Sequence, residues 1–360
     1  MSVSVYDSAT LSRAVTDLED AQRKARIMRL FKPGSVHMSD TFEYGYDTDY
    51  PHILKFQKKN EGASPIPATI GTLKQLTFPK LRHYTTYNEE DAKLLDPAVQ
   101  SYVGRNSNVS ANFAEKLVKQ LAKMKRYIDT THMVNCFTAL RTGVVTFKYG
   151  GGYADETIDF GYGSAGTATT SIIRTALSGS TAPTAIWTHA NATPIANIDT
   201  LANSIRATSQ YMGEFDVIMG TAAFNAFITH STVTNRLDNR RIESVGLNLR
   251  ESNEYKGNIN GYDIYQVSNE YLLNTTWTQA WDTNTIAVIP REDLDWFSTE
   301  YGAPFDRPTA GSERLQFLPT PYFSKMFIEE DPPIQKLLVE SRPIPVIKNT
   351  LCVRVQVVIS

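Results

Sequence analysis

Cysteine is scarce in this 360-residue chain: there are two, Cys136 and Cys352, far apart in the sequence. Two isolated cysteines favour buried thiols in a reducing compartment, and neither has the C-x-x-C spacing of a zinc site. No apolar run approaches the ~20 residues that cross a membrane, and no cationic start followed by an apolar run indicates a signal peptide. We therefore expect a soluble cytosolic product with no membrane partner.

Net charge is also small, at −2, so the chain has no overall basic footprint for nucleic acid and any basic surface must be local. Enzyme motifs are missing too: the six histidines form no H-E-x-x-H, and no P-loop or G-x-S-x-G elbow occurs. The run Gly161–Gly166 matches G-x-G-x-x-G after an expected strand, but a Ser/Thr-rich segment follows, with no acid before Asp199 to hold a ribose. The sequence thus predicts no enzyme, no cofactor and no metal.

One long helical pattern, from Ser110 to Gly143, dominates what is present. At ~1.5 Å per residue it predicts a rod of roughly 50 Å, longer than a compact domain needs. One face is apolar, and the opposite face is basic, with Lys116, Lys119, Lys123 and Arg126 at helical spacing. Gly143 ends the pattern, and Val144–Phe147 predicts a strand, with Thr157–Phe160 as the next. The basic stripe fits a solvated face, a neighbouring subunit or DNA.

The chain before this helix is amphipathic at first and then extended. We expect a helix from Ala9 to Leu30 that Pro33-Gly34 ends. It turns basic toward its end and has few acidic partners at helical spacing, which predicts contacts with other subunits or DNA for Arg23, Lys24, Arg26 and Arg29. Residues 39–87 read as a long two-stranded ribbon, too polar for its own core, with Lys58 and Lys59 before a Pro65-Ile66-Pro67 tip. A flexible insertion is the alternative.

The second half of the chain predicts a mixed α/β domain over residues 195–310. After a Ser/Thr/Gly-rich loop at 163–185, Asp199 is expected to cap a helix through Met212, and Asn239–Arg241 to lie in a polar loop. Further predictions are the strands Phe215–Met219, Tyr262–Val267 and Thr285–Ile289 and a helix at Ala222–Ile228. Alternating apolar residues from Leu351 to Ile359 predict a half-buried strand that pairs near Val144–Phe147.

This order of elements resembles the major capsid protein E family of lambda-type tailed bacteriophages over nearly the whole chain. The resemblance is carried by short motifs whose order and spacing agree, although each is weak alone. They are Met28-Arg29-Leu30-Phe31, Leu95-Asp96-Pro97-Ala98, Ile158-Asp159-Phe160-Gly161, Trp187 with Ala192–Ile198, Leu237–Arg241, Tyr255–Tyr262 and Asp331-Pro332-Pro333.

The resemblance implies an α+β chain with the Hong Kong-type phage capsid fold. It implies an N-terminal arm (1–37), an extended β-hairpin loop (38–88), a peripheral domain (89–194) with a spine helix at 110–143, an axial domain (195–310) and a C-terminal return to the peripheral domain (311–360). No long N-terminal scaffolding segment is expected in this chain, and no cross-linking motif matches.

The implied function is a major capsid protein that forms hexamers and pentamers of an icosahedral shell, assembled in the host cytoplasm around double-stranded DNA. The implied partners are other copies of the chain, a separate scaffolding protein and a portal, while the binding of a decoration protein stays open. Two alternatives stay open. One is an encapsulin-like compartment shell of the same fold, and the other is a soluble hydrolase or binding module. Encapsulated DNA, encapsulated protein or a monomeric chain would distinguish the three.

Overall fold

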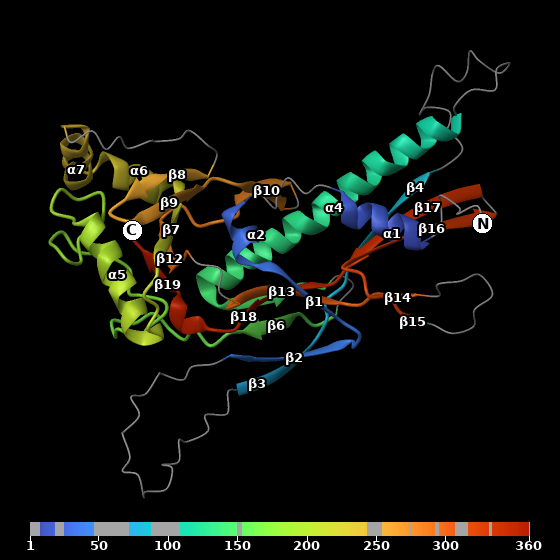
Figure 1. Ribbon diagram of the computed structural model, residues 1–360, viewed down its shortest axis with the longest axis horizontal. Helices are drawn as coiled ribbons and strands as arrows, with labels where there is room; N and C mark the ends of the chain where they lie inside the picture. Colours follow the sequence, from blue (N-terminus) through green and yellow to red (C-terminus); the bar gives the residue numbers. More distant parts are fainter. Residues whose placement is uncertain are drawn as a thin grey trace, which may run out of the picture.

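The computed structural model describes residues 8–18, 25–46, 72–87, 109–149, 153–242, 254–273, 275–291, 295–306, 316–330 and 333–359. A single long helix, α4 (Val109–Thr142), runs obliquely through the molecule (Figure 1). Long antiparallel strands accompany its N-terminal half, and a mixed sheet with three helices lies beyond its other end. The molecule is therefore elongated along this helix.

The predicted spine helix is confirmed to within one residue at each end. Leu117, Leu121, Met124 and Ile128 are buried, as their spacing requires. The helix stops at Gly143, whose φ of +68° is the left-handed conformation typical of a helix end, and its N–H donates to the carbonyl of Ala139. The expected strands follow as β5 (Val144–Phe147) and β6 (Glu156–Asp159), paired antiparallel.

A three-stranded antiparallel sheet, here called the peripheral sheet, packs against the N-terminal half of α4. It is formed by β16 (Tyr322–Glu330), β17 (Pro333–Ser341) and β4 (Leu81–Tyr87), in that order. Helix α1 (Ser8–Asp17) covers it beside α4. The shared core contains Leu11 and Val15 of α1, the four buried apolar residues of α4, and Tyr322, Leu337 and Val339 of the sheet.

A second sheet, here called the central sheet, ties the start of the chain to its end. It contains β1 (Lys32–His37), β13 (Phe297–Gly302) and β18 (Pro343–Ile347). The short helix α2 (Arg26–Leu30) precedes it. The single helix predicted from Ala9 to Leu30 is therefore wrong. Its two described parts pack in different places, α1 on the peripheral sheet and α2 in the core that includes the C-terminal half of α4.

The predicted ribbon is confirmed at its base, where β2 (Thr41–Tyr46) pairs antiparallel with β3 (Thr72–Thr77). Its expected middle, including Ile53–Phe56 and the Pro65–Pro67 tip, lies outside the described residues. The ribbon ends earlier than predicted, because β4 pairs with β17 in the peripheral sheet. A further short hairpin joins β14 (Phe305–Asp306) to β15 (Gln316–Phe317).

The axial sheet has five strands in the order β19-β12-β7-β9-β8. Their bounds are β7 (Phe215–Gly220), β8 (Tyr255–Ile259), β9 (Tyr262–Val267), β12 (Thr285–Pro290) and β19 (Arg354–Val357). The pair β7–β9 is parallel, and the other neighbours are antiparallel. A hairpin of β10 (Glu270–Leu273) and β11 (Thr276–Gln279) leaves this sheet between β9 and β12.

Three helices accompany the axial sheet, and two of them differ from the sequence prediction. Helix α5 (Pro194–Ser209) begins five residues before Asp199, because Pro194 has the backbone geometry of a first helical turn. Helix α6 (Thr221–Thr229) is as expected. Helix α7 (Ser231–Ile242) includes Asn239–Arg241, where we predicted a loop. In its first half, Ser231–Arg236, the polar side chains are mostly exposed and Val233 is buried.

The C-terminal strand pairs with a different partner from the one predicted. Strand β19 pairs antiparallel with β12, whereas β5 pairs with β6. Every residue of β12 is buried, so this strand needs neighbours on both edges, and β7 supplies only one. The Ser/Thr-rich loop is also better packed than expected. Ile172 and Leu177 are buried, and the N–H groups of Arg174 and Leu177 donate to carbonyls of β19.

Candidate assembly surfaces

The basic stripe predicted on α4 is exposed. Lys119, Lys123 and Arg126 all lie on the solvent side of the helix, opposite the buried apolar face. The Lys123 ammonium lies over the exposed ring of Tyr127, 6.0 Å from its centroid. Exposure confirms the predicted face.

Two charged residues on the same helix behave differently, because they are buried. Lys125 reaches the helix end of α1, donating to the carbonyl of Leu18 at 2.7 Å and to that of Thr16 at 3.4 Å. Asp129 accepts a hydrogen bond from the Tyr322 hydroxyl inside the peripheral core. Asp129 is thus directed into the peripheral core, although it is close in sequence to the exposed stripe. Both residues instead fix α1 and β16 on α4.

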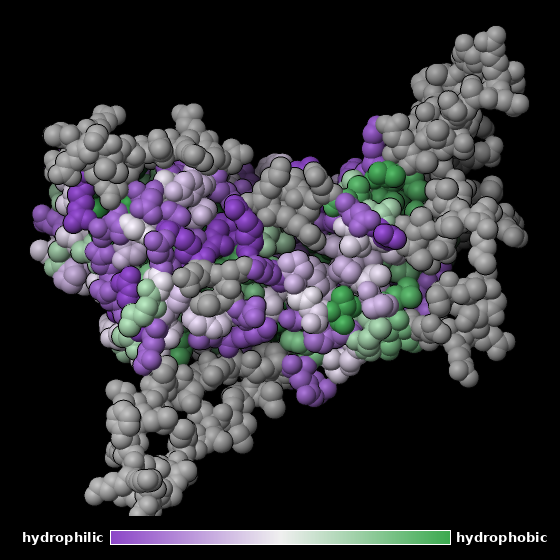
Figure 2. All heavy atoms as spheres, in the orientation of Figure 1, coloured by the Kyte–Doolittle hydropathy of each residue, from purple (hydrophilic) through white to green (hydrophobic). Residues whose placement is uncertain are grey.

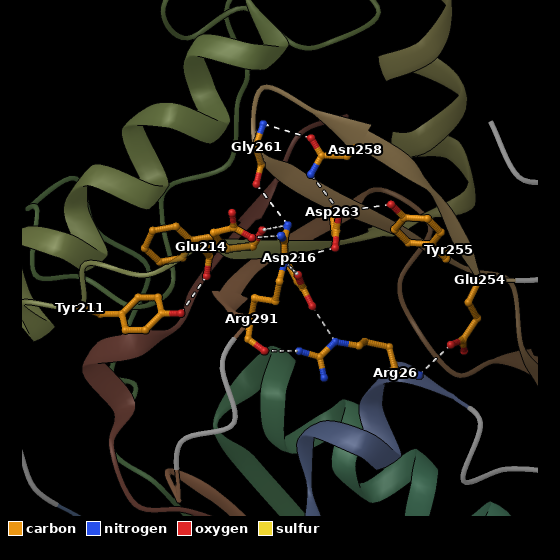
Figure 3. Close-up of polar contacts among 11 residues, drawn as sticks. Arg26, Tyr211, Glu214, Asp216, Glu254, Tyr255, Asn258, Gly261, Asp263 and Arg291 are labelled. Carbon is orange, nitrogen blue, oxygen red and sulfur yellow. Dashed lines mark hydrogen bonds and ion pairs between the residues drawn. The ribbon is translucent and has the colours of Figure 1, made fainter. Parts of the chain in front are cut away.

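The arm is attached to the axial sheet by an ion-pair network around Asp216, which lies in β7 (Figure 3). The Arg26 Nε donates to Asp216 Oδ2 at 2.6 Å, and the Arg291 Nε donates to Asp216 Oδ1 at 2.9 Å. The Asp216 side chain is 1% exposed and that of Arg26 12% exposed. Each carboxylate oxygen thus has its own arginine, one from the arm and one from the axial domain.

Further acids surround the two arginines. The backbone N–H of Arg26 donates to Glu254 Oε2 at 2.7 Å, so the first residue of α2 is held through both backbone and side chain. Arg291 also pairs with Glu214 and, at 3.2 Å, with Asp263. Burial raises the pKa of Asp216 and that of Glu254, and the neighbouring arginines oppose both shifts.

Arg26 has an acidic partner within the chain. We predicted contacts with another subunit or DNA because few acids stand at helical spacing from it, but its guanidinium is held by Asp216. Helical spacing could not reveal this partner, which is 190 residues away. Sequence reasoning also missed Asp216 itself. The available signal was a single acid inside the apolar strand Phe215–Met219, because a buried carboxylate requires a cationic partner.

The base of the ribbon has its own polar anchor at Glu300 of the central sheet. Its carboxylate faces the His37 Nε2 at 3.0 Å and accepts from the Ser298 hydroxyl at 2.8 Å and the Ser35 N–H at 2.9 Å. Burial alone would raise the pKa of Glu300, but these hydrogen bonds together lower it. The His37 ring also packs on Phe42 of β2 and on Phe78 just after β3. These contacts hold the base of the ribbon in place, and the ribbon extends outward from it.

The remaining candidate residues are placed as follows. Arg29 is exposed on α2, and its charge lowers the pKa of Glu254 as one of several opposing contributions to the net rise. Arg23, Lys24, Lys58 and Lys59 lie outside the described residues, as does the side chain of Lys116.

Exposed apolar side chains gather at the end of the molecule that holds the peripheral sheet (Figure 2). Among them are Val118, Phe305 and Phe327.

Comparison with solved structures identifies the architecture. A protein of a prophage of E. coli CFT073, described as a capsid protein, aligns with a TM-score of 0.61 at 14% identity, covering 98% of this chain and 99% of that one. A phage-related protein of Bordetella bronchiseptica RB50 aligns at 0.53 and 11% identity, covering 98% and 97%. The capsid of an empty GTA particle aligns at 0.50 and 10% identity, covering 95% and 91%. No curated protein matches in sequence.

The arm, the ribbon base, the long helix and the axial sheet thus define a capsid-type subunit, whose work is structural and not enzymatic. The model of the phage major capsid protein E family matches residues 7–357, and the chain belongs to this family. It is a phage major capsid protein, a component of the virion that assembles into a multimeric icosahedral shell. The alternative of a compartment shell that packages an enzyme is not favoured.

Proposed function

We propose that this chain forms hexamers and pentamers of a shell that encloses double-stranded DNA, and that the basic face of α4 borders the DNA. The supporting observation is the exposed stripe of Lys119, Lys123 and Arg126 on a rigid helix. Because the opposite face of α4 is buried in the subunit, the stripe points away from the core. Such a stripe would contact phosphates without reading sequence, and more weakly as salt rises.

By resemblance to the family, we also propose that assembly in the host cytoplasm uses a separate scaffolding protein and a portal, and that a decoration protein binds outside. The ribbon would extend over neighbouring subunits. The ribbon would make that contact from the fixed base formed by His37, Phe42 and Phe78. A two-stranded ribbon is marginally stable alone, so contact with a neighbour would stabilise it.

The test replaces Lys116, Lys119, Lys123 and Arg126 together with glutamine, in cells where the variant is the sole source of the capsid chain. We expect normal shells that retain less DNA, with the deficit largest at low salt, because salt weakens the phosphate contacts that the wild type keeps and the variant lacks. DNA content is measured from the absorbance of purified particles at 260 and 280 nm. A matched control changes four exposed cations elsewhere, Arg13, Lys32, Lys80 and Lys148, by the same total charge.

Two outcomes would contradict the proposal. A full DNA load at all salt concentrations would make the stripe a solvated face. Failure of the variant to form any shells, while the control forms them, would assign the stripe to a neighbouring subunit. The acidic run Glu329-Glu330-Asp331 is then a candidate partner.

A further inference from the structure

The hairpin β10–β11 carries an exposed apolar pair on its outer face. Leu272 lies directly opposite Trp277 in the register of the two strands, so their side chains share one face. Leu272 is 56% exposed and Trp277 is 67% exposed. The next pair on that face, Glu270 and Gln279, is polar and exposed. The outer face therefore has an apolar centre with a polar margin, which is the composition of a small contact site.

Trp277 differs from the other three tryptophans of the chain, all of which the structure describes. Trp187 and Trp281 are buried at 1% exposure, and Trp296 is partly buried. Truncation of tryptophan is among the most costly changes at protein interfaces, because the side chain buries a large area at little cost in conformational entropy. An exposed tryptophan opposite an exposed leucine on a two-stranded hairpin therefore indicates a surface that another protein covers.

The base of the hairpin is fixed, so the outer face points in a defined direction. The N–H of Ala280 donates to the carbonyl of Asn269 at 2.8 Å and closes the hairpin at its root. Just beyond it, the buried Trp281 ring packs against Phe137 of α4, with centroids 5.9 Å apart. The Nη1 of Arg141, near the end of α4, lies 3.9 Å from the Oδ2 of Asp282. The hairpin is therefore anchored to the end of the spine.

We propose that the Leu272–Trp277 face docks on a second copy of this chain within the shell. This proposal rests on the proposed function and specifies one of its contacts. Two side chains of this size offer on the order of 300 Å². That is well below the about 800 Å² that each partner of a stable complex buries. The face is thus too small to hold a separate partner alone. It suffices as one part of a contact that every copy repeats around a closed ring.

The chain offers a closely matched pair of variants for the test. Leu272 and Leu273 are adjacent, of the same residue type and almost equally exposed, at 56% and 54%, but they point to opposite faces of the hairpin. We expect Leu272→Ser and Trp277→Ser to raise the concentration needed for shell assembly by about tenfold or more, whereas Leu273→Ser changes it little. Sedimentation of shells away from unassembled chain gives this concentration.

A second measurement does not depend on the folding of the serine variants. The difference in iodide quenching of fluorescence between the wild-type chain and Trp277→Phe reports the exposure of Trp277. We expect this difference to be large in the unassembled chain and to fall several-fold in shells formed by the purified chain alone.

Each contrary result has a distinct meaning. Wild-type shells in which Trp277 stays quenchable, or equal damage by Leu272→Ser and Leu273→Ser, would overturn the hairpin contact alone. Loss of quenching only in particles from infected cells would overturn it in favour of a different partner protein. A wild-type chain that forms no shells even when the scaffolding protein is supplied would contradict the proposed function itself.

Discussion

Removal of the Arg26 guanidinium should release the arm from the axial sheet. In Arg26→Met, Asp216 keeps Arg291 on Oδ1 but loses its partner on Oδ2, while the backbone hydrogen bond to Glu254 survives. Breaking a buried ion pair on one side costs about 3–5 kcal/mol when the remaining charge has no other partner. Because Arg291 still compensates the charge, we expect a smaller cost of about 2–3 kcal/mol, near that of one unmade charged hydrogen bond.

Amide hydrogen exchange measures this loss of stability locally, at the backbone amides of the arm. A loss of about 2–3 kcal/mol should speed exchange at the protected amides of α2 and β1 about 30- to 140-fold, since each 1.4 kcal/mol is tenfold. Arg26→Lys should give an intermediate effect, because an ammonium keeps the charge but not the planar geometry of the guanidinium. Amides of the peripheral sheet should exchange as in the wild type.

The control is Arg13→Met, which removes another arm arginine. Its ion pair with Asp17 is exposed on both sides, at 87% and 71%, so its loss should hardly change exchange in α1. Protection of α2 and β1 in Arg26→Met within about twofold of the wild type would refute the reasoning. It would mean that apolar burial of Ile27, Leu30 and Phe31 holds the arm without the ion pair.

Two other predictions test packing and acid sensitivity. Gly143 and Gly163 have similar φ angles, +68° and +70°, but a Cβ would meet the Tyr162 ring at Gly143 and open space at Gly163. Chemical denaturation should therefore show a loss of about 1 kcal/mol for Gly163→Ala, and of at least about 2–3 kcal/mol for Gly143→Ala; equal losses would contradict the packing argument. Burial lowers the pKa of His132 from 6.5 to about 4, so the unfolded chain binds a proton first as pH falls. The free energy of unfolding should then fall between pH 6.5 and 4 by up to about 3 kcal/mol, and His132→Gln should remove that part of the slope; an unchanged slope in the variant would count against it.

The features with strong local signals were predictable from the sequence. The spine helix follows from apolar residues three and four apart and a glycine stop, and β7 and β9 follow from short apolar runs. The exposed side of the α4 stripe follows from the same periodicity. The basic residues are the complement of the buried face, so the exposure of Lys123 required no tertiary information.

Contacts between distant segments were not predictable in this way. The register of β19 against β12 joins residues about 70 positions apart, and nothing in the alternation of residues 351–359 selects β12 over β5. The same holds for Arg26 and Asp216. A basic helix in isolation resembles a contact surface for DNA, and only the folded chain shows that one of its arginines is already paired.

Buried charges and exposed apolar side chains therefore have different roles in this subunit: the charges join elements within the chain, and the apolar side chains are available for contact with other chains. Its buried charges at Arg26, Lys125 and Asp129 all connect the N-terminal elements or the peripheral sheet to the body. Its exposed apolar side chains include Leu272 and Trp277 on one two-stranded hairpin and Phe305 on another. A two-stranded hairpin that exposes a contiguous apolar pair, as Leu272 and Trp277 do, is unusual in a protein that works as a monomer. In a subunit that belongs to a shell, such hairpins are the elements on which contacts with other copies can be formed without altering the core.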